Sequence, residues 1–96
     1  MEDAVKDKDV RRDVAAALRY DSSRDSAPVV VAAGTGRMAQ KIVEVARREG
    51  VPLYQDSELA KTLCDLGIGV EIPPRLYEAV AKVLVFVARL DEKSGL

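Results

Sequence analysis

A strand, a glycine turn and an amphipathic helix follow one another over residues 29–49. Residues 29–33 form an apolar run that begins with three valines, which is typical of a strand covered on both faces. The glycines within 34–36 permit a sharp turn, and residues 37–49 carry apolar side chains at helical spacing. Residues 51–55 then predict a second strand, which a right-handed crossover would place parallel to the first. The pattern therefore predicts a βαβ unit.

The glycine turn also has the outline of a nucleotide-binding fingerprint. Gly34-Thr-Gly36-Arg-Met-Ala39 approximates G-x-G-x-x-A, and Asp56 follows about 20 residues later. Any tight strand-to-helix turn favours glycine, however, with or without a ligand. A chain of 96 residues also leaves no room for two lobes around a cofactor. We therefore expect structural glycines and no cofactor. The alternative is a small nucleotide- or phosphate-binding enzyme that uses the Gly34–Ala39 turn.

Charge and hydropathy exclude several classes of partner. The 15 basic and 16 acidic residues nearly cancel and are interleaved along the chain. This is not the charge pattern of a protein that binds nucleic acid or an anionic membrane. No apolar run is long enough for a membrane span, and the first nine residues are too charged for a signal peptide. We expect a cytoplasmic protein that recognises its partners by shape or local pattern.

The residue types that common catalytic and metal sites need are missing. The chain has no His and no Asn, which excludes Ser-His-Asp and Cys-His catalysis, histidine metal sites and asparagine chemistry. The neighbours of the single cysteine, Cys64, predict a helix facing the core, so we expect a structural thiol. The carboxylates are scattered in turns and caps, where they ordinarily accept backbone N–H bonds. We predict no catalytic residue, no metal site and no enzyme activity.

The remaining elements contain one ambiguity. Residues 14–20 alternate as in a strand, whereas their alanine run favours a helix. A short helix is predicted from residue 56 or 57 to residue 66, and a closing helix from about 75 to 90. The apolar surface of the closing helix is wide enough to cover the sheet or to form an interface. Residues 1–13 and 91–96 are predicted to be flexible tails.

Six short pieces occur in order along the chain: Ala17-Leu-Arg-Tyr20, Asp25-Ser-Ala-Pro-Val-Val-Val-Ala-Ala33, Glu49-Gly-Val-Pro52, Leu59-Ala60, Glu71-Ile-Pro-Pro-Arg-Leu-Tyr-Glu-Ala-Val-Ala81 and Val87-Ala-Arg-Leu90. Their order and spacing resemble the cytoplasmic domain of the FlhB/YscU family, the export-switch proteins of flagellar and virulence type III secretion systems. The resemblance covers residues 14–90, and it implies a strand at 14–20 and a glycine turn that holds no nucleotide. We therefore predict an α/β fold in which a small mixed sheet of about three strands, with its βαβ unit, is covered by three helices.

One departure from the resemblance concerns self-cleavage. Members of the family carry a transmembrane domain and an Asn-Pro-Thr-His motif, in which the asparagine side chain attacks the following carbonyl carbon. The corresponding positions here are Val10-Arg11-Arg12-Asp13, so the nucleophile and the rest of the motif are gone. The strand that would precede the motif is missing or replaced by the charged tail. The chain looks like a free-standing soluble relative of the half that follows the cleavage site.

The resemblance implies a non-catalytic interaction module of a flagellar or type III protein export system, without autocleavage. Its expected partners are export-gate components or export substrates, and its expected place is the cytoplasm, at the periphery of the membrane export apparatus. A third possibility is a degenerate paralogue with an interaction role elsewhere.

The strand at residues 14–20 is the predicted docking site, because the strand that would cover its edge is missing. An open edge is a template for an extended peptide. The residues expected to flank this edge are Arg11, Arg12, Asp13, Arg19 and Tyr20. Two alternatives are that the tail at residues 2–12 folds over the edge, or that two copies pair there as a homodimer. The predicted core residues are Val30, Ile42, Leu63, Val80 and Leu84.

Overall fold

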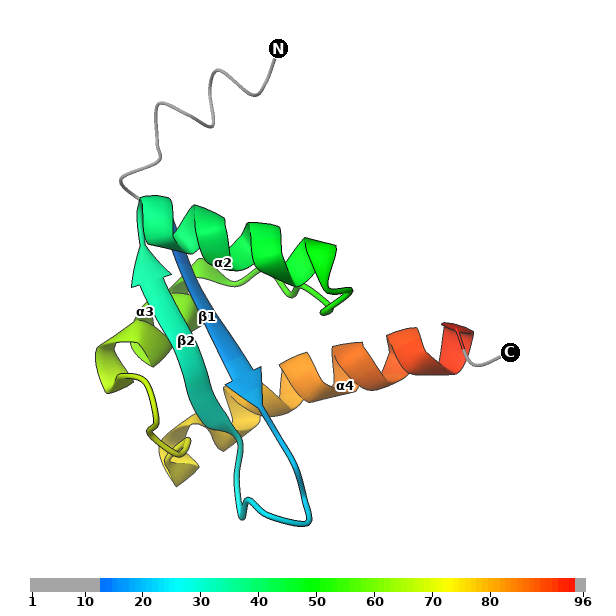
Figure 1. The fold of residues 1–96 in the computed structure, drawn as a ribbon. Helices are drawn as coiled ribbons and strands as arrows, with labels where there is room; N and C mark the ends of the chain where they lie inside the picture. The colour runs from blue at the N-terminus through cyan, green and yellow to red at the C-terminus, as the bar shows by residue number, and fades with distance from the viewer. Residues whose placement is uncertain (1–12, 95–96) are drawn as a thin grey trace.

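The computed structural model describes residues 13–94. These residues form two strands, three α-helices and one short 3-10 helix (Figure 1). In chain order the elements are β1 (Val14–Arg19), β2 (Val29–Thr35), α2 (Arg37–Arg48), α3 (Ser57–Leu66), η2 (Pro74–Leu76) and α4 (Tyr77–Ser94). The predicted flexible tail at the N-terminus lies outside the described residues, apart from Asp13.

The two strands pair antiparallel and form the whole of the described sheet. Val14 lies opposite Thr35 at one end of the pair, and Arg19 lies opposite Val29 at the other. The register shifts once, after Ala17, and Val31 is the extra residue on β2. Residues 14–19 are therefore a strand, as the family resemblance implies, although their alanines favour a helix by propensity.

The predicted third strand is wrong, and with it the βαβ unit. Residues 51–55 are not a strand in the described structure. Pro52 has no N–H to donate, and the free edge of β2 is already occupied by the segment around Val70. The Val30 N–H donates to the Val70 carbonyl at 3.0 Å, and the Gly69 N–H donates to the Val30 carbonyl at 2.7 Å. A parallel neighbour for β2 on that side is therefore blocked.

Helices cover both faces of the strand pair. Figure 1 shows α2 across one face, with α3 and the start of α4 behind the other. The buried core lies on the second face and joins β2 to both helices: Val30, Leu59, Leu63, Ile72 and Val80. Of the predicted core residues, Val30, Leu63 and Val80 are buried, Ile42 is half-buried, and Leu84 is 36% exposed. The prediction for Leu84 is wrong because α4 continues beyond the sheet (Figure 1).

The helix ends follow local signals in the sequence. The carboxylate of Asp56 accepts a hydrogen bond from the Leu59 N–H at 3.1 Å and so caps α3. Pro74 begins the 3-10 turn that leads into α4. The helical backbone of α4 continues to Ser94, past the predicted end at Leu90. Among residues 13–94, none of the helices combines the length and the apolar character that crossing a bilayer requires.

Candidate functional site

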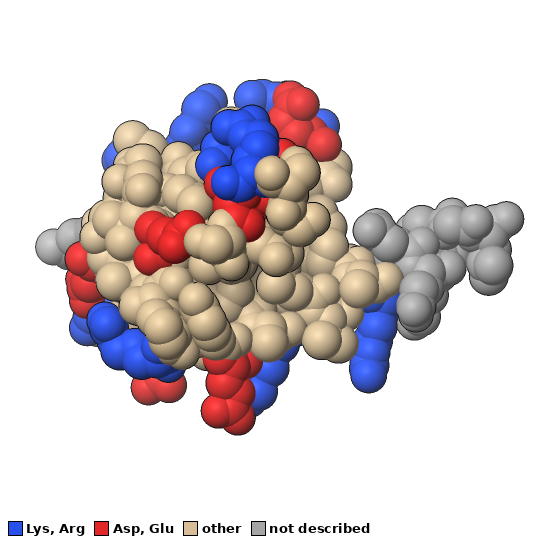
Figure 2. All heavy atoms as spheres, turned by 90° about the horizontal axis from the view of Figure 1, so that it is seen from below, with Lys and Arg blue, Asp and Glu red and all other residues tan. Residues whose placement is uncertain are grey.

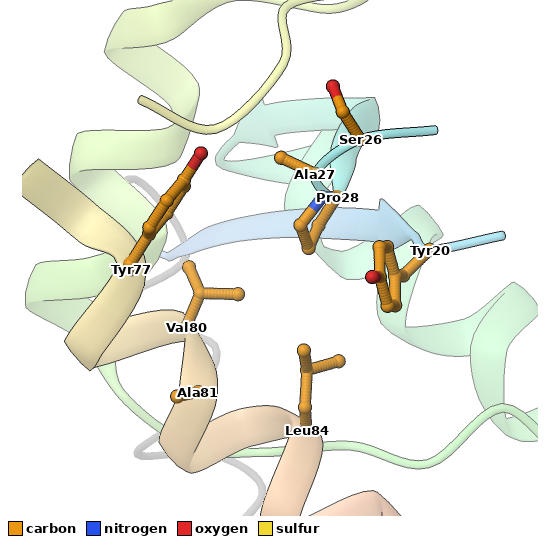
Figure 3. Close-up of a pocket in the computed structure, with 8 residues that line it drawn as sticks. All are labelled: Tyr20, Ser26, Ala27, Pro28, Tyr77, Val80, Ala81 and Leu84. Carbon is orange, nitrogen blue, oxygen red and sulfur yellow. The ribbon is translucent and has the colours of Figure 1, made fainter. Parts of the chain in front are cut away.

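A shallow apolar hollow lies where the end of β1, the β1–β2 loop and the first turns of α4 meet (Figure 3). Its volume is about 200 Å³. The buried side chains of Ala27, Pro28 and Val80 form its base. The rings of Tyr20 and Tyr77, each residue 48% exposed, stand at either end. The lining residues are Tyr20, Ser26, Ala27, Pro28, Tyr77, Val80, Ala81 and Leu84.

The chain builds this hollow from two segments that are far apart in sequence. Pro28 fixes the entry of the chain into β2, and the Ile72 N–H donates to the Pro28 carbonyl at 2.8 Å, which ties the loop to the segment before α4. The hydroxyl of Ser26 donates to Oε2 of Glu71 at 3.0 Å across the same junction. Both contacts hold the β1–β2 loop against the segment that leads into α4, and α4 forms the opposite wall of the hollow.

The chemistry of the hollow is that of an apolar recognition surface. None of its lining residues carries a carboxylate, an amine or a guanidinium. Figure 2 shows the molecule from below, where a broad uncharged area is surrounded by acidic and basic side chains. The tyrosine and serine hydroxyls supply the only side-chain polar atoms of the lining. Such a surface can hold an apolar side chain and orient it through a few hydrogen bonds, and the Ser26 hydroxyl is engaged by the exposed Glu71 carboxylate.

Two of the predicted site residues, Arg19 and Tyr20, lie together at the end of β1. Tyr20 is part of the hollow. Arg19 donates to the carboxylate of Asp25 in the loop, and this hydrogen bond holds the pKa of Asp25 below its ordinary value. Arg19 is therefore bound in place beside the hollow, with its side chain still 44% exposed.

Asp13 lies at the opposite end of β1. The rise per residue of an extended strand places it roughly 20 Å from Arg19 and Tyr20. Its carbonyl accepts the Gly36 N–H at 2.9 Å, and its Oδ2 accepts from Nε2 of Gln40 at 3.3 Å. Asp13 thus anchors the start of α2 and does not join Arg19 and Tyr20. The predicted residues Arg11 and Arg12 lie outside the described residues.

Most residues of the hollow were missed by sequence reasoning. Only Tyr20 was predicted, while the contributions of the β1–β2 loop and of α4 were not. The wide apolar surface of the closing helix was the one signal that pointed to α4, since it exceeds what a surface helix needs to cover a sheet. Nothing local in the sequence indicates that Pro28 and Leu84 face one hollow.

The structure gives the glycine turn a packing role. A side chain at Gly34 would collide with that of Met38, so the close approach of α2 to β2 requires glycine there. Gly36 has a φ of 60° and donates its N–H to Asp13. Asp56, the acidic residue of the apparent fingerprint, caps α3. The dinucleotide fingerprint also needs a parallel strand after the helix, and the described sheet holds only an antiparallel pair.

Cysteine and carboxylate side chains do not form a metal site within the described range. Residues 13–94 contain no group of three or more His, Cys, Asp or Glu side chains placed to hold an ion. The Cys64 thiol on α3 lies 3.3 Å from the carbonyl oxygen of Ala15 and 3.6 Å from that of Gly34. It therefore fastens α3 to both strands, in agreement with the predicted structural thiol.

Comparison with known proteins places this fold in one group. A model of the FlhB HrpN YscU SpaS family matches residues 12–87. The uncharacterized protein YlqH of Bacillus subtilis is 41% identical over 78 residues, which cover 81% of this chain and 84% of YlqH. The flagellar biosynthetic protein FlhB of Aquifex aeolicus is 45% identical over 75 residues, which cover 77% of this chain. This chain spans only 21% of the length of that FlhB.

Solved structures agree with the sequence matches. The C-terminal domain of PscU is 32% identical with a TM-score of 0.72, over 78% of this chain and 96% of that domain. The cytoplasmic domain of FlhB from Shewanella putrefaciens is 29% identical with a TM-score of 0.78, over 96% of this chain and 79% of that domain. Sequence and fold thus point to the same group of proteins.

Proposed function

The chain belongs to the FlhB HrpN YscU SpaS family, and we propose that it is a non-catalytic interaction module of a flagellar or type III protein export system. In this proposal it acts in the cytoplasm, at the periphery of the membrane export apparatus. It binds export-gate components or export substrates and does not cleave itself. The names of the similar proteins support the export role, and the hollow supports recognition by binding.

The apolar hollow is the observation that carries this proposal. Burying one leucine- or phenylalanine-sized side chain contributes about 2 kcal/mol, which is about a 30-fold change in affinity. One such anchor does not make a tight complex, because association itself costs more than this. The hollow therefore suits a transient contact with one apolar side chain of an extended protein segment. Transient contact is the mode that successive passage of export substrates requires.

No observation favours the alternative of a nucleotide- or phosphate-binding enzyme. Gly34 is explained by its packing against Met38, and the Gly36 N–H is already bonded to Asp13. The proposed absence of autocleavage is supported by the absence of asparagine from the chain.

The proposal is tested by calorimetric titration of the purified chain with two sets of purified proteins from its own cell, namely soluble export-apparatus components and the substrates of its flagellar or type III export system. The test variant is Leu84→Glu, which puts a charge into the hollow. The matched control is Leu90→Glu on the same helix, because Leu90 is 38% exposed against 36% for Leu84 but does not line the hollow.

We expect a member of one set to bind, and Leu84→Glu to weaken this binding about tenfold or more, since a buried unpaired charge is costly. Leu90→Glu should bind like the unaltered chain. Binding to neither set, or equal weakening by both variants, would contradict the proposal. Thermal unfolding of each variant checks that the fold survives. A parallel titration with ATP, NAD and flavin tests the enzyme alternative, for which we expect no heat of binding.

A further inference from the structure

We propose that Tyr54 is a positioning residue for the hollow. Tyr54 lies in the α2–α3 linker (residues 49–56) and does not line the hollow itself. Through its contact with Phe86, it holds the part of α4 that carries Leu84 against the β1–β2 loop. This inference rests on the proposed function only in taking the hollow to bind an apolar side chain.

The hollow and Phe86 lie on different sides of α4. The residues of α4 that line the hollow recur at helical spacing and share one side of the helix: Tyr77, Val80, Ala81 and Leu84. Figure 3 shows Val80 and Leu84 pointing from α4 toward the β1–β2 loop. Phe86 follows Leu84 by two positions, which turns its side chain by about 200° around the helix axis. Phe86 therefore faces away from the hollow.

The ring of Tyr54 meets Phe86 on that other side of α4. The two ring centroids are 5.4 Å apart and the interplanar angle is 68°, an edge-to-face arrangement that aromatic pairs favour. Tyr54 is 39% exposed, and Phe86 is half-buried. A shift of α4 away from the β1–β2 loop would therefore press Phe86 against Tyr54.

The outer end of the hollow depends on this contact. Val80 is buried, and Val83 is the last residue in the described part of α4 that packs against the core. Leu84 follows these two residues and is 36% exposed. It therefore lies between the core contact of Val83 and the aromatic contact of Phe86. The core positions Val80, whereas the position of Leu84 depends on both contacts.

The α2–α3 linker can resist a shift of α4 because both of its ends are fixed. The Val51 N–H donates to the Ala46 carbonyl of α2 at 2.8 Å. At the other end, the Asp56 carboxylate accepts the Leu59 N–H of α3, and Leu59 is buried in the core. Tyr54 is therefore carried by a short segment between two anchored helices.

The opposite wall of the hollow is held by contacts of its own. Arg19 donates to Asp25 beside the hollow, and the Ile72 N–H donates to the Pro28 carbonyl. With that wall fixed, a movement of α4 changes the width of the hollow. A gap of about 0.5–1 Å removes roughly a quarter to a half of the dispersion attraction between two atoms. Even a small shift of α4 would therefore weaken the binding of an apolar side chain.

The experiment measures the binding of a defined probe to the hollow of the full chain. The probe is the pentapeptide Gly-Ser-Leu-Ser-Gly with blocked ends, and the control peptide has alanine in place of leucine. NMR titration follows the amide signals of Ala81 and Leu84, which line the hollow. We expect the leucine peptide to bind more tightly than the alanine peptide, because it buries a larger apolar side chain.

Tyr54→Ala removes the ring and should weaken probe binding about threefold or more. Tyr54→Phe keeps the ring and should bind the probe like the unaltered chain. Leu53→Ala is the matched control, because Leu53 lies in the same linker and is 41% exposed against 39% for Tyr54. It should leave the affinity for the probe unchanged.

A double-mutant cycle tests whether Tyr54 acts through Phe86. Phe86→Leu removes the aromatic pair from the side of α4, and in this background Tyr54→Ala should change the probe affinity by less than about 1.5-fold. Thermal unfolding verifies that each variant is folded. If Tyr54→Ala does not fold, Tyr54→Leu takes its place, because leucine keeps more apolar volume in the linker.

Three outcomes would overturn the inference. Equal probe affinity of Tyr54→Ala and the unaltered chain would show that Tyr54 contributes to stability alone, and would leave the hollow as the binding site. Equal weakening by Tyr54→Ala and Leu53→Ala would assign the effect to the linker as a whole. A leucine peptide that does not bind the unaltered chain would overturn both this inference and the role of the hollow in the proposed function.

Discussion

Arg19 donates two hydrogen bonds to the carboxylate of Asp25, one from Nε at 3.3 Å and one from Nη2 at 3.2 Å. Asp25 also accepts the backbone N–H of Asp21 at 3.3 Å. The pair therefore ties the end of β1 to the loop that leads into β2, directly beside the hollow. Because these bonds favour the ionised carboxylate, they lower the pKa of Asp25, and the Arg19 side chain is the largest cause.

We predict that Arg19→Gln raises the pKa of Asp25 toward its ordinary value, as measured by carbon-detected NMR titration of the carboxyl group. Because the pKa in the folded state is depressed, the interaction stabilises the fold above the unfolded-state pKa. That stabilisation is lost as the pH falls through the folded-state pKa. The variant and the unaltered chain should therefore converge in stability at strongly acidic pH.

Arg24→Gln is the control and should shift the pKa of Asp25 less, since Arg24 is the smallest of the causes that lower it. An unchanged pKa in Arg19→Gln would contradict the geometry.

Two neighbouring valines on β2 provide a matched test of the core. Val30 is fully buried, whereas Val31 is 43% exposed. Val30→Ala should lower the free energy of unfolding by about 2 kcal/mol, because it opens a cavity between β2, α3 and α4. Val31→Ala should cost less than about 0.5 kcal/mol. Chemical denaturation measures both changes, and equal losses would show that the core is assigned wrongly.

The contact between Gly34 and Met38 is testable by a double-mutant cycle. Gly34→Ala should cost about 1 to 3 kcal/mol of folding free energy, because the new methyl group meets the Met38 side chain. Met38→Ala alone should cost little, since Met38 is largely exposed. Combining the two changes should recover part of the loss. A Gly34→Ala chain of undiminished stability would remove the packing explanation for this glycine.

The elements that the sequence predicts well are those with local signals. The glycine turn before α2, the Asp56 cap of α3 and the proline at the start of α4 each act within a few residues of the boundary they set. These signals act between residues that are close in sequence, so the sequence alone is enough to recognise them. The three predicted helices, α2, α3 and α4, are accordingly confirmed.

The errors concern contacts between distant segments. Residues 51–55 have the composition of a strand, but a strand also needs a free edge beside it, and the segment at residues 69–72 occupies the one on β2. Leu84 has the spacing of a core residue, yet the sheet is too narrow to cover it. The hollow likewise joins Pro28 to Ala81, which are more than 50 residues apart. Local patterns carry no information on which distant segments meet.

The last prediction concerns the integrity of the chain. The family resemblance aligns a self-cleaving Asn-Pro-Thr-His motif with Val10-Arg11-Arg12-Asp13, and the chain contains no asparagine. Without that side-chain amide no internal nucleophile of this kind can attack the backbone. Asp13, in the place of the histidine, is also engaged by Gln40 and Gly36.

We therefore expect the intact mass of the purified chain to persist for days at neutral and mildly alkaline pH in protease-free buffer. Mass spectrometry before and after incubation measures this. A sample incubated in denaturant is the control. Slow chemical hydrolysis of the backbone does not depend on the fold, whereas self-cleavage by a motif requires the folded chain. A specific fragment beginning near Arg11 that appears only from the folded chain would show that other residues of this segment support backbone cleavage.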